Sequence, residues 1–176
     1  MKKAIPSEYK KTIHDINYKG LKDSGIKCLI FDLDNTLTNM DTNIPDDKTV
    51  KLIERLKKDF DIYILSNNHN KKRLNEVSGI LNIPYVALAL KPSKIGFARV
   101  LKRVNAKREE VCVIGDQIVT DIIGGNRLKA TTVLVEPLGK RDLKITSFNR
   151  FLEKKIIKRL EKQDKFKKGE YYDKRG

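Results

Sequence analysis

The chain has 176 residues and a formal net charge of +15, and it contains no stretch of about 18 consecutive apolar residues. The length suits one domain with a complete core, and without a long apolar stretch we expect no transmembrane helix. Because the charged N-terminal segment has no apolar stretch behind it, we also expect no secretory signal and a cytoplasmic protein.

The excess of positive charge predicts an anionic partner, such as nucleic acid, an acidic membrane surface or a phosphorylated substrate. An organism whose proteins are generally rich in Lys would give the same excess, because Lys far outnumbers Arg in this chain. Composition leaves both explanations open.

Residues 1–26 form a polar N-terminal arm, which we expect to hold one short helix and to pack across a sheet or lie on the surface. From residue 27, short apolar runs alternate with helical patterns, and Asp46 and Ser93 suit the first positions of two of the helices. We expect strands at residues 27–32, 60–65, 85–90, 111–114 and 131–135, and helices from about residue 46, over 70–81, from Ser93 and over 119–128. This alternation indicates βαβ units. The sequence therefore predicts an α/β fold over residues 27–147, a three-layer αβα Rossmann-like sandwich with a parallel sheet of about five strands.

Residues 148–176 differ from the core, because an apolar stripe is surrounded there by basic residues. This pattern predicts a basic amphipathic helix, followed by a tail that we expect to be disordered near residues 165–169. Such a helix packs on its own domain or lies on an anionic membrane. The stripe consists of Phe151, Leu152, Ile156 and Leu160, and the basic residues are Arg150, Lys154, Lys155, Lys158, Arg159 and Lys162.

The two cysteines, Cys28 and Cys112, both fall in expected buried strands. We expect reduced, inert core thiols, as in most cytosolic proteins.

Two carboxylates mark the end of the first core strand, where Asp32 and Asp34 follow an apolar run. Residues two apart in a strand point to the same face, and open α/β sheets bind ligands at the carboxyl ends of their strands. Two close carboxylates repel each other, so the pair indicates a bound metal or a division of acid and base roles.

Other strand ends add groups that suit a phosphate ester. Ser66 and Asn67 follow the second strand, Lys91 follows the third, and Asp116 follows the fourth, with Asp121 just beyond it. Mg²⁺ prefers oxygen ligands, and Asp32 and Asp116 can supply them. The Ser66 hydroxyl, the Asn67 backbone N–H and the Lys91 ammonium suit the phosphate oxygens.

The motifs Asp32-Leu33-Asp34-Asn35-Thr36-Leu37, Ser66, Lys91 and Gly115-Asp116 to Asp121 resemble those of the haloacid dehalogenase-like (HAD-like) phosphohydrolase superfamily. The resemblance implies a Mg²⁺-dependent phosphomonoesterase with Asp32 as nucleophile, Asp34 as general acid and base, and an aspartyl-phosphate intermediate. It also implies that Ser66 and Lys91 bind phosphate and that Asp116, with Asp121, forms the acidic pair that binds Mg²⁺. With Asp32 and Asp34, these two residues make up the expected metal ligands. Lys94 is a rival to Lys91.

Only about 33 residues separate Asp32 from Ser66, and about 24 separate Ser66 from Lys91, so neither gap holds a folded cap domain. The chain thus resembles the capless class IIIA branch, whose open site suits a large substrate or a surface. More narrowly, the Asp-Asn-Thr-Leu, Ser66-Asn67-Asn68 and Lys91-Pro92 segments resemble the YqeG/Gep4 group. That resemblance implies phosphatidylglycerophosphate as substrate and a peripheral position on the inner face of the membrane.

Rival interpretations remain within and outside the enzyme class. Within the enzyme class, the alternative to the lipid is a phosphatase of a soluble sugar phosphate, a nucleotide or a phosphoprotein. A nucleic-acid- or ribosome-associated binding protein on the same fold would also explain the charge, although the chain has no recognisable nucleic-acid motif.

Overall fold

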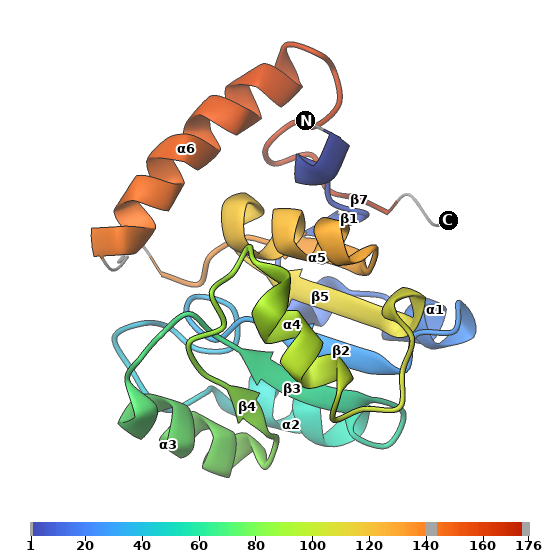
Figure 1. Cartoon of the computed structure of the whole chain (residues 1–176), viewed down its shortest axis with the longest axis vertical. Helices are drawn as coiled ribbons and strands as arrows, with labels where there is room; N and C mark the ends of the chain where they lie inside the picture. Colours follow the sequence, from blue (N-terminus) through green and yellow to red (C-terminus); the bar gives the residue numbers. More distant parts are fainter. Residues whose placement is uncertain (1, 140–143, 174–176) are drawn as a thin grey trace.

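The computed structural model describes residues 2–139 and 144–173 and shows an α/β fold built on one mostly parallel sheet (Figure 1). The strand order is β4-β3-β2-β5-β6-β1-β7, and only β7 runs antiparallel to its neighbour. The strands are β1 (Glu8–Lys10), β2 (Cys28–Phe31), β3 (Asp61–Leu65), β4 (Tyr85–Val86), β5 (Val111–Gly115), β6 (Thr131–Val135) and β7 (Tyr172–Asp173). The expected fold class is confirmed.

Helices cover both faces of this sheet, and the side chains of β2 alternate between the two resulting cores. Leu29 and Phe31 pack with α1, α2 and α3, whereas Cys28 and Ile30 pack with α4 and α5. This alternation is the period-two pattern of a strand that is buried on both faces. The α-helices are α1 (Tyr18–Asp23), α2 (Asp47–Leu56), α3 (Lys71–Leu81), α4 (Lys94–Leu101), α5 (Ile123–Leu128) and α6 (Lys144–Glu161). Shorter helical turns are η1 (Lys2–Ala4), η2 (Ile13–Asp15), η3 (Arg108–Glu110) and the π-helical turn η4 (Ile118–Ile122).

Two helices begin where the sequence indicates. The Asp46 side chain accepts a hydrogen bond from the Thr49 N–H at 2.7 Å, and the Ser93 side chain accepts one from the Ile95 N–H at 3.3 Å. Each side chain thus pairs a backbone donor that the first turn of its helix would otherwise leave free.

The sheet has two more strands than the five expected, and both come from outside the expected core. Part of the N-terminal arm forms β1 beside β6, and part of the tail forms β7 beside β1. The two strands are too short to show a clear alternation in the sequence. The third expected strand is also shorter than predicted, because pairing with β3 is limited to Tyr85 and Val86.

The basic helix α6 packs on the domain, and the expected disorder after it is wrong. Leu160 is buried against a group that includes Tyr9 and Ile122, and Phe166 joins the same group. The rings of Tyr9 and Phe166 lie 5.1 Å apart between centroids. Figure 1 shows α6 standing beside η1.

Within the described residues, we find no helix that has both the length and the apolar character needed to cross a bilayer.

Candidate active site

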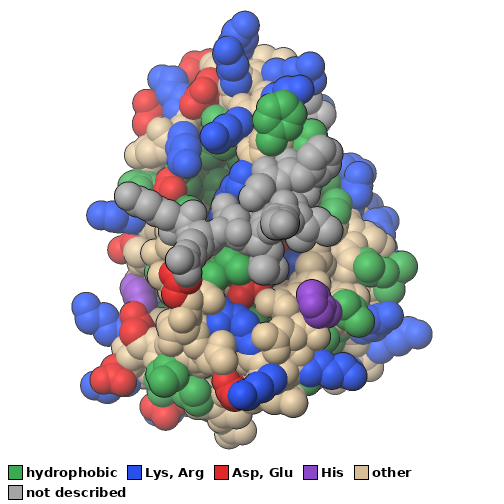
Figure 2. Space-filling model, turned by 90° about the vertical axis from the view of Figure 1, so that its left-hand side faces the viewer, with side chains coloured by type: hydrophobic (Ala, Val, Ile, Leu, Met, Phe, Trp, Pro, Cys, Tyr) green, Lys and Arg blue, Asp and Glu red, His purple; other side chains and the backbone are tan. Residues whose placement is uncertain are grey.

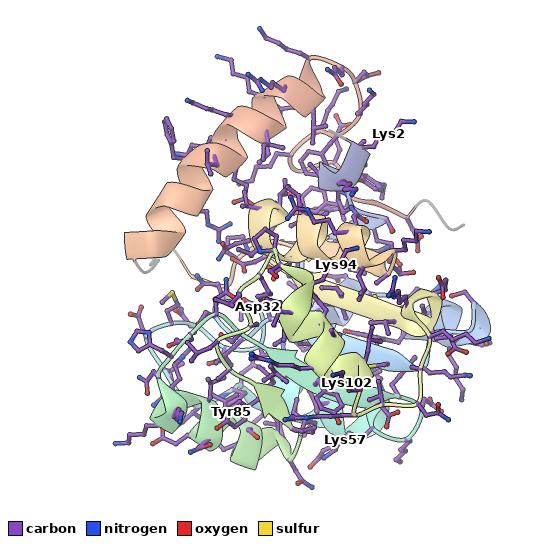
Figure 3. All side chains as sticks on the ribbon, in the orientation of Figure 1. Lys2, Asp32, Lys57, Tyr85, Lys94 and Lys102 are labelled. Carbon is purple, nitrogen blue, oxygen red and sulfur yellow. The ribbon has the colours of Figure 1, made fainter. Side chains whose placement is uncertain are left out.

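The carboxyl ends of the central strands meet at one edge of the sheet, to the left in Figure 1, where the label of Asp32 lies in Figure 3. Asp32 directly follows β2, and its backbone N–H donates to the carbonyl of Ile114 in β5 at 2.8 Å. The ladder between the two strands therefore continues into the site and fixes the backbone of Asp32. Asp116 directly follows β5, and Ser66 directly follows β3.

Lys91 connects two of the acidic residues. Its Nζ atom lies 2.5 Å from Oδ1 of Asp32 and 2.7 Å from Oδ1 of Asp121, and all three side chains are almost completely buried. Burial by itself lowers the pKa of Lys91, but the carboxylates of Asp121 and Asp32 together raise it above its ordinary value. Lys91 is therefore a fixed positive charge inside the site, whereas Lys94 is exposed at the start of α4.

The backbone of Lys91 is held by the side chain of Asn67. The Lys91 N–H donates to Oδ1 of Asn67 at 2.7 Å, and Nδ2 of Asn67 donates to the Lys91 carbonyl at 3.0 Å. This reciprocal pair connects the end of β3 to the segment that carries the lysine. Ser66 is buried beside it, and its Oγ accepts a hydrogen bond from the Asn68 N–H at 3.0 Å.

Three buried carboxylates form the group that could hold a metal ion. One oxygen from each of Asp32, Asp116 and Asp121 lies within 4.8 Å of the others. Burial raises the pKa of Asp32 to about 7 against the opposing effect of Lys91, with repulsion from Asp121 and Asp34 adding to the rise. Burial and repulsion from Asp32 likewise raise the pKa of Asp116, whereas the positive charge of Arg150 lowers it. A divalent cation would relieve this repulsion, and carboxylate oxygens are the ligands that Mg²⁺ prefers.

Asp121 reaches the group because a glycine makes room for it. A Cβ atom at position 115 would lie 2.4 Å from the carboxylate of Asp121, so only glycine fits there. Asp121 lies in the π-helical turn η4, and its Oδ2 accepts a hydrogen bond from the Gln117 N–H at 3.1 Å. π-Helical turns are rare and often occur at functional sites.

The carboxylate of Asp34 lies outside that acidic group, although we listed it among the expected metal ligands. Its Oδ1 accepts a hydrogen bond from Nε of Arg73 at 2.9 Å, and its Oδ2 accepts one from Nδ2 of Asn68 at 3.1 Å. The structure thus separates the two carboxylates of the first motif. Asp32 faces Lys91, and Asp34 faces Arg73 and Asn68.

Helix α6 also reaches this edge of the sheet. The guanidinium of Arg150 forms an ion pair with Oδ2 of Asp116 and donates to the Asp116 carbonyl at 3.0 Å. Glu153, one turn later, accepts a hydrogen bond from the Ile118 N–H and pairs with Arg150 at 2.9 Å. The basic helix therefore contacts the acidic group through one of its cations.

Arg73, Arg150 and the side chains of Asn67 and Asn68 were missed by the sequence analysis. A signal for Arg73 was present, because residues 73, 77 and 81 share one face of a helix and the other two are apolar. An arginine on such a face must find a buried partner. Arg150 gives no comparable signal, since it is one of many basic residues on an amphipathic helix.

The chain is similar to known phosphatases. A family model described as HAD-hydrolase-like matches residues 89–147. The Probable phosphatase YqeG of Bacillus subtilis is 37% identical over 160 residues, which cover 90% of this chain and 92% of that protein. Phosphatidylglycerophosphate phosphatase 1, chloroplastic/mitochondrial, of Arabidopsis thaliana is 30% identical over 147 residues, covering 78% of this chain. The match covers only 42% of that longer protein.

The fold also has counterparts among solved structures. A predicted HAD-like family hydrolase from Porphyromonas gingivalis superimposes with a TM-score of 0.54 at 13% sequence identity. The match covers 73% of this chain and 98% of that one. At this identity, the likeness concerns the fold alone.

Proposed function

The chain belongs to the HAD-like phosphatases, and we propose that it hydrolyses a phosphomonoester through an aspartyl-phosphate formed on Asp32. The observation that carries this proposal is the meeting of Asp32, Lys91 and Asp121 within hydrogen-bonding distance at the carboxyl edge of the sheet. A carboxylate nucleophile there splits the hydrolysis into two easier steps.

In the first step, an oxygen of Asp32 attacks the phosphorus atom, and the bond to the alcohol oxygen of the substrate breaks. Asp34 then gives a proton to the leaving oxygen, and in the second step it takes a proton from the water that attacks the phosphorus of the aspartyl-phosphate. The products are inorganic phosphate and the regenerated Asp32 carboxylate. Lys91 and the Ser66 hydroxyl are the groups that we assign to the phosphate oxygens.

The metal assignment follows from the donor set. A bound Mg²⁺ ion, held by Asp32, Asp116 and Asp121, would offset the negative charge of the phosphoryl group and of the three carboxylates. The carboxylate of Asp34 binds Arg73 and Asn68 instead, which suits it to the proton transfers assigned to it above.

We further propose phosphatidylglycerophosphate as the substrate. Three features support it: the relationship to a plant phosphatidylglycerophosphate phosphatase, the net charge of +15 and the basic outer face of α6. A helix with such a face is suited to an anionic membrane. The gaps between the motifs are too short for a cap domain, which leaves the site open to a headgroup at a surface.

The experiment is to measure phosphate release with Mg²⁺ from phosphatidylglycerophosphate in mixed micelles and from a panel of soluble phosphomonoesters. The Asp32→Asn protein serves as the blank. We expect release that depends on Asp32 and is much faster with the lipid. Equally slow release from all esters would overturn the lipid as substrate but would leave the proposed phosphatase reaction standing. No release that depends on Asp32, together with tight RNA binding that weakens steeply with salt, would favour a nucleic-acid-binding protein instead.

A further inference from the structure

Hydrophobic side chains are exposed around the mouth of the candidate active site. They belong to segments that follow the carboxyl ends of strands or begin the next helix. Of the eight large hydrophobic side chains exposed among the described residues, only Ile80 and Tyr171 lie elsewhere. We call the other six the apolar rim: Ile44, Leu88, Leu90, Ile95, Leu138 and Phe151.

Contacts of the backbone and of neighbouring residues place three members of this rim beside the site. The Leu138 N–H donates to the carbonyl of Asn35 at 2.9 Å, just after Asp34. Phe151 follows Arg150, whose guanidinium contacts Asp116. Leu90 directly precedes Lys91. These three residues of the rim therefore lie beside the polar centre that we assign to phosphate hydrolysis.

Leu88 and Leu90 show that the exposure is built into the backbone. Both leucines have positive φ angles, +48° and +56°, which bulky residues rarely adopt. Their side chains are 51% and 58% exposed. Ala89 between them is fully buried, donates to the Ser66 carbonyl at 3.0 Å and accepts from the Gly96 N–H at 3.1 Å. The backbone is fixed at Ala89 while the two leucines are held in solvent. Strained backbone of this kind is concentrated at functional sites.

Basic side chains are exposed in the same kinds of segment as the apolar rim. Lys71 and Lys72 are exposed at the start of α3, which follows the carboxyl end of β3, and Lys94 is exposed at the start of α4. The Nζ atom of Lys155 lies 4.4 Å from the centroid of the Phe151 ring. Figure 2 looks onto this side of the molecule and shows separate hydrophobic patches interspersed with Lys and Arg side chains.

From this arrangement we propose that the apolar rim docks on an anionic lipid bilayer, with its side chains in the headgroup region and the catalytic centre facing the lipid phosphates. Separate leucines among lysines suit the interface of a bilayer, where apolar side chains enter and cations meet anionic headgroups. A protein partner is a poorer match, because protein interfaces are depleted of Lys and their strongest contacts rarely come from Leu. The inference rests on the proposed function, since it assigns a lipid surface to the same site.

The test is sedimentation with vesicles, using the Asp32→Asn protein so that no turnover occurs. Vesicles of phosphatidylcholine with phosphatidylglycerol are compared with vesicles of phosphatidylcholine alone. In this background, the double variant Leu88→Asn, Leu90→Asn removes two apolar side chains of the rim. Asn is chosen because it tolerates positive φ angles. Ile80→Asn is the matched control, because Ile80 is 44% exposed but lies near the far end of α3. A second pair, Ile44→Asn with Leu138→Asn, replaces the leucine pair if that variant melts at a lower temperature.

We expect the parent protein to bind the anionic vesicles, the leucine pair to bind them about tenfold more weakly, and the Ile80 variant to bind as the parent does. If the Leu88/Leu90 double variant bound the vesicles as tightly as the parent protein, charge alone would attract the protein to the membrane. That result would overturn the proposal that the apolar rim docks there. No binding of the parent would overturn it as well. Phosphate release from soluble esters without vesicle binding would leave the proposed phosphatase function intact, whereas vesicle binding without any release would overturn that function alone.

Discussion

Nε of Arg73 lies 2.9 Å from Oδ1 of Asp34, and the other nitrogens of the same guanidinium bind three oxygens of the loop after β2. These oxygens are the carbonyls of Asn39 and Thr42 and the Oδ1 atom of Asn43. Arg73 is almost completely buried at the start of α3. A planar guanidinium with five donors can hold a carboxylate and a loop at the same time, which a lysine cannot do.

We therefore predict that Arg73 positions Asp34 for proton transfer. Arg73→Met and Arg73→Lys should lower kcat by about 100-fold for a phosphate ester of an alkyl alcohol, whose oxygen needs a proton to leave. The loss should be less than about tenfold for p-nitrophenyl phosphate, because nitrophenolate leaves without one. The measurement is steady-state kinetics with both esters, and Lys72→Met, an exposed cation on the same turn, is the control. An equal loss with both esters would show that Arg73 has only a structural role.

The acidic group gives a prediction about metal binding that does not depend on turnover. Mg²⁺ should stabilise the protein by about 2.7 kcal/mol at a concentration 100 times its Kd, because it binds only the folded state. For a chain of this length the midpoint of thermal unfolding should rise by roughly 5–10 °C. Asp116→Asn should abolish most of the shift, whereas Asp41→Asn, at an exposed acid in the loop after β2, should retain it. A shift that persists in the Asp116 variant would place the metal elsewhere.

The sequence predicted the parts of the site that sit at strand ends. Asp32, Ser66 and Asp116 each follow an apolar run and directly follow a strand, so the edge at which they meet can be inferred from the parallel sheet alone. Lys91 also follows an apolar run, but it lies in the segment between β4 and α4 and not at the end of a strand. The strands β2, β3, β5 and β6 were predicted for the same reason, because buried strands leave a strong apolar signal. The edge strand β4 was predicted too long.

Contacts between distant segments could not be predicted in this way. Tyr9 pairs with Phe166, and Arg150 pairs with Asp116, and neither contact leaves a local pattern in the sequence. The seven-stranded sheet follows from the same kind of contact, since β1 and β7 are held by their neighbours and not by their own composition. The partner of Asp34 could not be predicted either, because the first motif does not indicate that the Asp34 carboxylate binds Arg73 in α3.

Burial predicts that the two thiols react slowly. Neither Cys28 nor Cys112 is in a disulfide, both are buried, and burial raises the pKa of the Cys28 thiol from 9.0 to about 12. At pH 8 the thiolate fraction of Cys28 should be about 1000-fold smaller than for an ordinary thiol, and the thiolate is the reactive form. We expect no rapid reaction of the native protein with a disulfide reagent, and reaction of both thiols in guanidinium chloride. Rapid labelling of the native protein would contradict the burial of these strands.

Two glycines provide a matched pair for the last prediction, which concerns the support of Asp121. Gly115→Ala should destabilise the protein by about 1–3 kcal/mol, because the added Cβ would lie 2.4 Å from the Asp121 carboxylate and must displace it or β5. Phosphatase activity should fall with it, since Asp121 pairs with Lys91. Gly79→Ala, in the interior of α3 with open space around the new Cβ, should instead stabilise the protein by about 0.5–1 kcal/mol.

The measurements for this pair are chemical denaturation and the rate of phosphate release. If the free energy of unfolding falls in Gly115→Ala and rises in Gly79→Ala, the steric requirement at Gly115 is separated from the general cost of a glycine in a folded chain. A Gly115→Ala protein with parental stability and parental activity would show that the carboxylate of Asp121 can move away without consequence. Asp121 would then have no part in holding Lys91 or a metal, and the acidic group would be reduced to Asp32 and Asp116.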